Sequence, residues 1–76
     1  MTAEQFLGII QKRPFRPFVI HTGSGERYAV NHPENAMISP SGKTIAVFLP
    51  AEVTAIIDND AIMECVVSPS QPASTN

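Results

Sequence analysis

The spacing of turn-forming residues is the feature of this sequence that most restricts its fold. From Pro14 onward, proline, glycine and asparagine interrupt the chain every few residues, and the short runs between them are rich in β-branched and aromatic residues. Runs this short predict strands rather than helices. A single helical turn is expected around Pro33 and Glu34, because proline is favoured at the first helical position. The predicted strands are Phe18–Thr22, Arg27–Val30, Ala36–Ser39, Thr44–Leu49, Val53–Asp58 and Ala61–Val67.

The segment before Pro14 is the part of the sequence with a helical pattern. Thr2 and Gln5 fit a capping box, in which each side chain bonds to the backbone of the other residue. Apolar residues then follow at spacings of three and four, namely Phe6, Ile9 and Ile10. Pro14 disfavours helical geometry at the residue before it. The sequence therefore predicts a helix over residues 3–12.

This order of elements indicates the fold class. One helix followed by strands, with no second helix to cross over, favours an α+β fold that is mostly β. We expect five to six short antiparallel strands that form a curved sheet or a small barrel, with the helix across an open end or face. The run Thr44–Leu49 is almost entirely apolar, which predicts burial on both of its faces. Residues 1–67 should form a single small domain, and the polar tail 68–76 is predicted to be disordered.

The composition limits the classes of function. Five basic and seven acidic residues give a net charge of −2, so no global field attracts nucleic acid or anionic lipid. No apolar run approaches the ~20 residues needed to span a bilayer. The charges near the N-terminus run in the reverse order to those of a signal peptide. We therefore expect a cytoplasmic protein that does not bind membranes.

The segment Lys12–His21, with the sequence KRPFRPFVIH, contains Arg-Pro-Phe twice. Its Pro-x-x-Pro spacing is also that of ligands for SH3-type domains. Such ligands lie in exposed, disordered segments, whereas this one lies between a predicted helix and a predicted strand. Each proline blocks helix formation, and Phe15 and Phe18 supply apolar area at the joint. We interpret the repeat as a rigid corner.

Lys12, Arg13 and Arg16 form the one basic cluster of the sequence, with phenylalanines between them. Base stacking on phenylalanine, together with phosphate contacts, is a mechanism for binding single-stranded nucleic acid. A small nucleic-acid-binding barrel is therefore the alternative function. The favoured explanation is a solvated helix end, where cations in the last turn complement the helix dipole.

Four residues are candidates for catalysis or metal binding: His21, His32, Glu34 and Cys65. A cysteine nucleophile needs a histidine base nearby, and a cysteine in an apolar strand is usually a small core residue. Alternation turns His21 outward if Phe18 and Ile20 face inward. No two of the candidates have ligand spacing on one element. We expect no enzyme activity, no cofactor and no metal.

The lone cysteine excludes an intrachain disulfide, so self-association is the expected source of extra stability in a chain this small. Phe18–Ile20 and Ile45–Leu49 are apolar at successive positions and lack the lysines or prolines that guard edge strands. We expect a homodimer or a higher symmetric oligomer. The leading hypothesis is a non-catalytic interaction or self-association module, which leaves room for an unknown protein partner. A closed monomeric barrel is the structural alternative.

Three stretches carry a resemblance to known proteins: Pro-Phe-Arg-Pro-Phe at 14–18, His-Pro-Glu at 32–34 and Ser-Pro-Ser-Gly-Lys-Thr at 39–44. Their order resembles a family of short, uncharacterised bacterial proteins, over residues 1–67. This resemblance implies a bacterial source and no particular activity. The chain also has a looser likeness to Sm-like and SH3-like small barrels, in which a helix precedes the strands. The Sm-type RNA-binding motif is missing, so that likeness does not imply RNA binding.

Overall fold

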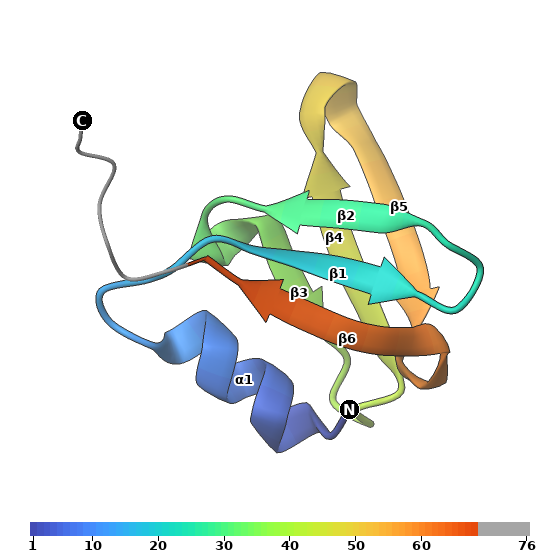
Figure 1. Ribbon diagram of the computed structural model, residues 1–76, viewed down its shortest axis with the longest axis horizontal. Helices are drawn as coiled ribbons and strands as arrows, with labels where there is room; N and C mark the ends of the chain where they lie inside the picture. The colour runs from blue at the N-terminus through green and yellow to red at the C-terminus, as the bar shows by residue number, and fades with distance from the viewer. Residues whose placement is uncertain (69–76) are drawn as a thin grey trace.

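A computed structural model describes residues 1–68, and these residues form one α-helix and six strands (Figure 1). The tail predicted to be disordered lies outside the described residues except for Ser68, whose backbone N–H donates to the Pro17 carbonyl at 2.9 Å. The elements are α1 (Ala3–Gln11), β1 (Phe18–Thr22), β2 (Arg27–Val30), β3 (Ala36–Ile38), β4 (Thr44–Leu49), β5 (Val53–Asp58) and β6 (Ile62–Val67), with short 3-10 turns η1 (Pro33–Asn35), η2 (Pro50–Glu52) and η3 (Asn59–Ala61).

Helix α1 begins at the predicted capping box. The Thr2 backbone N–H donates to Gln5 Oε1 at 2.9 Å, and the Gln5 backbone N–H donates to Thr2 Oγ1 at 3.0 Å. The helix ends at Gln11, one residue before the predicted end, because Lys12 has extended backbone angles. The helix contributes one fully buried side chain, Phe6.

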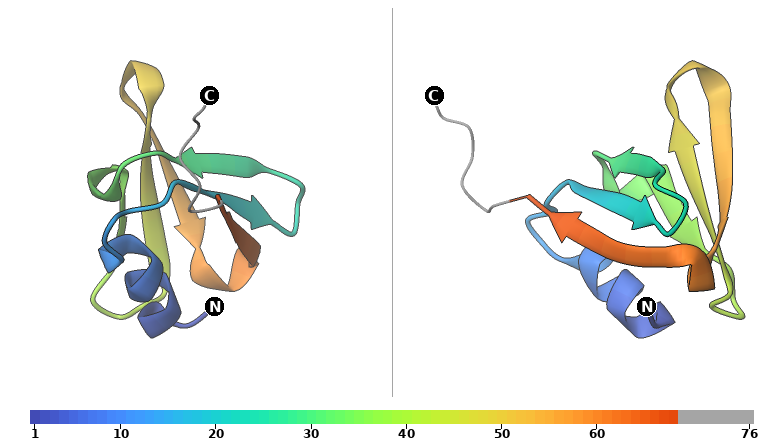
Figure 2. Two further views of the ribbon diagram at one scale, coloured as in Figure 1. Left: turned by 60° about the vertical axis from the view of Figure 1, so that its left-hand side comes forward. Right: turned by 45° about the vertical axis from the view of Figure 1, so that its right-hand side comes forward.

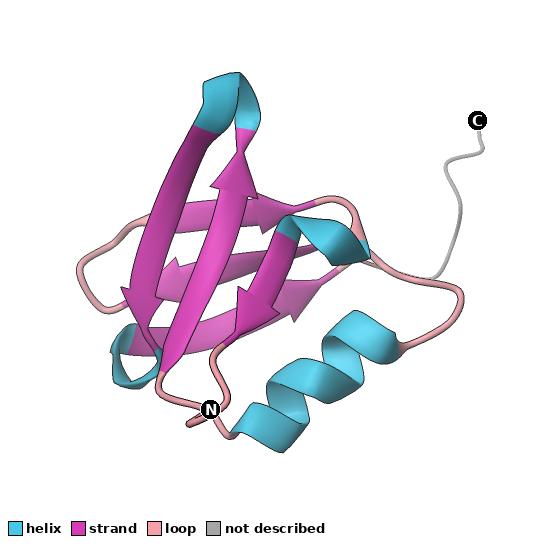
Figure 3. Cartoon of the chain, turned by 180° about the vertical axis from the view of Figure 1, so that it is seen from behind, coloured by secondary structure: helices cyan, strands magenta, loops and turns pink. Residues whose placement is uncertain are grey.

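The strands form two antiparallel sheets of three strands each, with the orders β2–β1–β6 and β3–β4–β5 (Figure 3). The chain passes from the first sheet to the second through η1, between β2 and β3, and returns through η3, between β5 and β6. The predicted α+β, mostly β class is confirmed. The sheets do not close into a barrel, because β5 pairs with β4 and β6 pairs with β1 but no pairing joins β5 to β6 among residues 1–68.

The hydrophobic core lies between the inner faces of the two sheets, and α1 lies across one open end of it (Figure 2). Alternate residues of β1 and β4 point inward, which matches the two-residue period of strands. Burial of each large core side chain contributes about 1.5–3 kcal/mol. The core residues are Phe6, Phe18, Ile20, Val30, Ala36, Ile45, Val47, Ile57 and Ile62.

The doubled Arg-Pro-Phe forms the connection between α1 and β1. The Phe18 ring is buried and meets two other rings edge-on, that of Phe6 at 6.1 Å and that of Phe15 at 6.2 Å between centroids. The two prolines keep the segment out of the helix. The repeat therefore serves as the corner that the sequence predicts.

Two sequence-based expectations about the strands are wrong. Thr44–Leu49 is not buried on both faces, because Ile45 and Val47 point into the core whereas Phe48 is 42% exposed. The single helix covers an end of the core and leaves the outer face of this strand open (Figure 2). β1 and β4 are also not edge strands, since each is the central strand of its sheet.

None of the helices within residues 1–68 is long and apolar enough to cross a membrane.

Candidate functional site

The outer face of the β3–β4–β5 sheet carries a group of exposed apolar side chains. Strand register places Met37 beside Ala46 and Ala46 beside Ile56, which makes one row across all three strands. Met37 is 58% exposed and Ile56 is 68% exposed. We call Met37, Ala46 and Ile56 the apolar row. With Phe48, two positions further along β4, they make up the apolar face.

A hollow of about 330 Å³ lies at one end of this face. Its walls are mostly carbon, because proline, methionine and alanine side chains make up much of the lining. Such a hollow can accept an apolar side chain from another molecule. The residues that line it are Met37, Ile38, Ser39, Pro40, Thr44 and Ala46.

The outer face of the β2–β1–β6 sheet has an apolar row of its own, in which Val19 lies between Ala29 and Val66, but it also carries charged groups. Register places His21 between Arg27 and Glu64, and we call these three residues the charged row. His21 Nδ1 lies 3.4 Å from Glu64 Oε2, and both side chains contact solvent. A smaller hollow of about 180 Å³ lies beside this row. Arg27 and Glu64 are exposed and His21 is partly exposed, so the charged row faces solvent.

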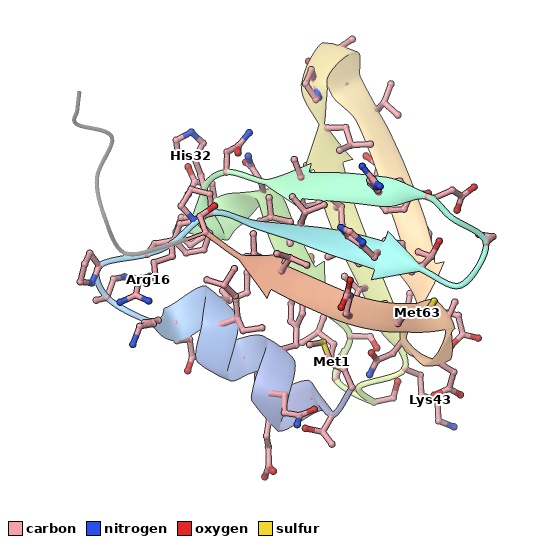
Figure 4. All side chains as sticks on the ribbon, viewed as in Figure 1. Met1, Arg16, His32, Lys43 and Met63 are labelled. Carbon is pink, nitrogen blue, oxygen red and sulfur yellow. The ribbon has the colours of Figure 1, made fainter. Side chains whose placement is uncertain are left out.

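The predicted basic cluster is divided between two tasks. Arg13 Nη1 donates to the carbonyl oxygens of Ile10 at 2.9 Å and Lys12 at 2.8 Å, so its guanidinium caps the end of α1. Arg16 is half-buried at the corner that follows the helix (Figure 4). Lys12 is exposed and lies just past the last helical turn. Among the three cations, one already serves as a cap, which weakens the case for a phosphate-binding cluster.

The four candidates for catalysis or metal binding do not come together. Cys65 lies opposite Ile20, which points into the core, whereas His21 points outward, so the thiol and this imidazole are on opposite faces of the sheet. His32 lies at the far end of β2, beside η1, which contains Glu34 (Figure 4). Within residues 1–68, no group of three histidine, cysteine or acidic side chains could hold a metal ion.

The Cys65 thiol is half-buried. Burial raises the pKa of Cys65 above its ordinary value, and the opposing effect of the N-terminal ammonium group is smaller. Its sulfur lies 3.8 Å from Met1 Sδ. A protonated thiol is a poor nucleophile, so this shift disfavours a nucleophilic role for Cys65.

Asn59 is a buried polar residue that the sequence analysis did not single out. Its Nδ2 donates to the carbonyl oxygens of Met1 at 2.8 Å and Gly42 at 2.9 Å, and its backbone N–H donates to the Lys43 carbonyl at 2.8 Å. One side chain thus ties the start of the chain and the β3–β4 turn to the connection between the sheets. Its position between Asp58 and Asp60 predicts a turn and gives no sign of these distant partners.

Comparisons of this chain with family models, with curated proteins and with solved structures give no match. The resemblances noted in the sequence remain predictions.

Proposed function

We propose that this chain is a small, non-catalytic self-association module that uses the β3–β4–β5 sheet as its contact surface. The observation that carries the proposal is the apolar row, which places two exposed large side chains on the outer face of the sheet. Exposed apolar patches with a polar rim are typical of interaction sites. Only 16% of the residues are charged, so a partner covers this surface without removing many ions from water.

The size of the apolar face suits a reversible contact. Full burial of an exposed large apolar side chain contributes about 1.5–3 kcal/mol, and Met37, Phe48 and Ile56 contribute only part of this because they are 58%, 42% and 68% exposed in the single chain. Association must also offset lost translational and rotational freedom, which costs about 4–15 kcal/mol. In a two-fold dimer each side chain contributes twice. Because the free energy gained by apolar burial is close to the cost of association, we expect an association that depends strongly on protein concentration.

The other functions considered from the sequence have less support. Arg13 is engaged as a helix cap, which leaves Lys12 and Arg16 for contact with nucleic acid. His21 and Cys65 lie on opposite faces of their sheet, which disfavours a catalytic pair. We place the module in the bacterial cytoplasm, in keeping with the resemblance to short bacterial proteins and with a lone thiol that such a compartment keeps reduced.

Light scattering over a range of protein concentrations tests this function. The unaltered chain should show an average mass that rises above 8.2 kDa as the concentration increases. Ile56→Lys should abolish the rise, because it puts a charge in the apolar row at a position that is already 68% exposed and therefore tolerant of substitution.

The matched control is Met63→Lys on β6, where the side chain is 74% exposed but lies outside the apolar face. This variant should associate like the unaltered chain. Equal association of Ile56→Lys and the unaltered chain would show that the β3–β4–β5 sheet is not the contact surface.

A further inference from the structure

We infer that a second copy of this chain docks along the edge of β5, so that the two β3–β4–β5 sheets join into one antiparallel sheet across a two-fold axis. This inference rests on the proposed self-association and places its contact at the β5 edge, where the partner meets Ile56 and leaves Met37 and Phe48 on the outer face. It concerns the edge of the sheet, where Ile56 belongs both to the apolar face and to the last strand.

The edge of β5 is open. Within residues 1–68, β5 pairs with β4 alone, and the β4–β5 hairpin forms the outer border of the molecule in the right-hand view of Figure 2. An edge strand presents unpaired N–H and C=O groups to any strand that approaches it. The sequence of β5, VTAIID, has no lysine, arginine, proline or glycine, and four of its six residues are β-branched. Its one charged residue, Asp58, is the last residue of the strand.

The other edges are better protected. β2 has only four residues and begins with Arg27. β6 carries Glu64 near its middle, whereas the one charged residue of β5, Asp58, stands at the end of the strand. β3 has only three residues, and Pro40 follows it closely. Charged side chains, short length and nearby proline are the means by which proteins discourage edge pairing. β5 is therefore the edge that favours pairing.

Two-fold symmetry limits the possible registers. Residues that face each other in an antiparallel pair point to the same side of the sheet. In two identical strands, facing residues are therefore an even number of positions apart in the sequence. One residue at the centre of the pair then lies opposite its own copy. With Ile56 at the centre, the two isoleucines meet on the apolar face, and Ala55 lies opposite the partner's Ile57 on the core side. Thr54 then lies opposite the partner's Asp58. In these pairs apolar residues face apolar ones and polar residues face polar ones, and the remaining strand residue, Val53, lies opposite the partner's Asn59 just beyond the strand.

The neighbouring registers are less favourable. With Ala55 at the centre, Asp58 lies opposite the partner's Glu52, and like charges directly opposite each other are destabilising. With Ile57 at the centre, Asp58 lies opposite the partner's Ile56, which leaves a carboxylate without a polar partner. Charge and hydrophobicity thus both select Ile56 as the centre.

The Thr54–Asp58 pair can form a hydrogen bond in this register. Asp58 Oδ1 already accepts from the backbone N–H of Asp60 at 3.0 Å. Oδ2 is available to accept from the Thr54 hydroxyl of the partner, since a carboxylate can accept at both oxygens. Both residues are exposed in the single chain, so neither needs to leave a buried site.

Disulfide trapping in a Cys65→Ala background tests this register. Ile56→Cys should form a disulfide-linked dimer under mild oxidation, because opposite Cα atoms in an antiparallel pair lie about 4.5–5.5 Å apart and a disulfide spans about 4.4–6.8 Å. Thr54→Cys is the matched control. Its two copies would lie about 13 Å apart along the strands, so it should stay monomeric on a non-reducing gel.

A double variant, Thr54→Cys with Asp58→Cys, should restore the linked dimer. In each copy, position 54 faces position 58 of the partner, so the dimer has two facing pairs of cysteines. Trapping of Ala55→Cys or Ile57→Cys in place of Ile56→Cys would overturn the register. Failure of both Ile56→Cys and the double variant to link, while light scattering shows that the unaltered chain dimerises, would overturn edge pairing but leave the proposed function intact. A monomeric unaltered chain would overturn both.

Discussion

The two sheets of this molecule cover the same core but present different outer faces. In both sheets, inward positions are apolar and buried, as folding requires. The outward positions of the β2–β1–β6 sheet include the charged row, and those of the β3–β4–β5 sheet include the apolar row. Folding of the single chain imposes no need for large apolar side chains on an outer face. The apolar row is the feature on which we base the proposed contact with another molecule.

The largest expected effect distinguishes the inside of the sheets from the outside. Phe18→Ala should lower the free energy of unfolding by about 3–5 kcal/mol, because Phe18 is buried and packs against two other rings. Phe48→Ala removes the same side chain from the outer face and should cost about 1 kcal/mol or less. Urea unfolding at low protein concentration measures both. Similar losses would mean that Phe48 is part of the core.

The next effect concerns the tie between the sheets. Asn59→Ala should cost about 1–3 kcal/mol, because it leaves the carbonyls of Met1 and Gly42 without their donor. Asp60→Ala, at the exposed neighbouring position, should change stability by about 0.5 kcal/mol or less. Thermal unfolding compares the two variants. A neutral Asn59→Ala would show that the β5–β6 connection is held by packing alone.

The hairpins of the two sheets should respond in opposite directions. In the β4–β5 turn, Ala51 and Glu52 both have positive φ, 63° and 64°, which costs about 1–2 kcal/mol per residue. Replacing them with Asn-Gly, the pair that such a turn prefers, should stabilise the protein by about 1 kcal/mol. In the β1–β2 turn, Gly25 has φ 92°, so Gly25→Ala should destabilise by a similar amount, about 1 kcal/mol. Chemical denaturation that gave the same sign for both would contradict the backbone geometry.

The smallest effect belongs to the charged row. Glu64→Gln removes a solvent-exposed partner of His21 and should change the free energy of unfolding by less than about 0.5 kcal/mol. It should also leave the mass in light scattering unchanged. A loss of association in this variant would place the contact on the wrong sheet for our proposal.

Much of the local structure can be predicted from the sequence. Thr2 and Gln5 fix the start of the helix, and the turn residues fix the strand boundaries to within one residue. These features depend on neighbours in the chain, through capping bonds and backbone preferences. The helix start and the strand boundaries can therefore be predicted from the sequence.

The position of each strand in its sheet could not be predicted in the same way. Thr44–Leu49 is apolar on both faces, so its pattern does not show which face the core covers; strand order and the docking of α1 decide that. Asn59 illustrates the same limit, because its partners Met1 and Gly42 are 58 and 17 residues away in the chain. Contacts at such separations depend on the assembled fold.

Amide hydrogen exchange at low and high protein concentration tests the central claim most directly. Unpaired amides on the β5 edge exchange quickly in a single chain, and pairing protects them. We expect protection to rise with concentration in β5 and to stay constant in β1, β2 and β6. Protection that is independent of concentration in every strand, or that rises in β6 instead, would contradict self-association through the β3–β4–β5 sheet.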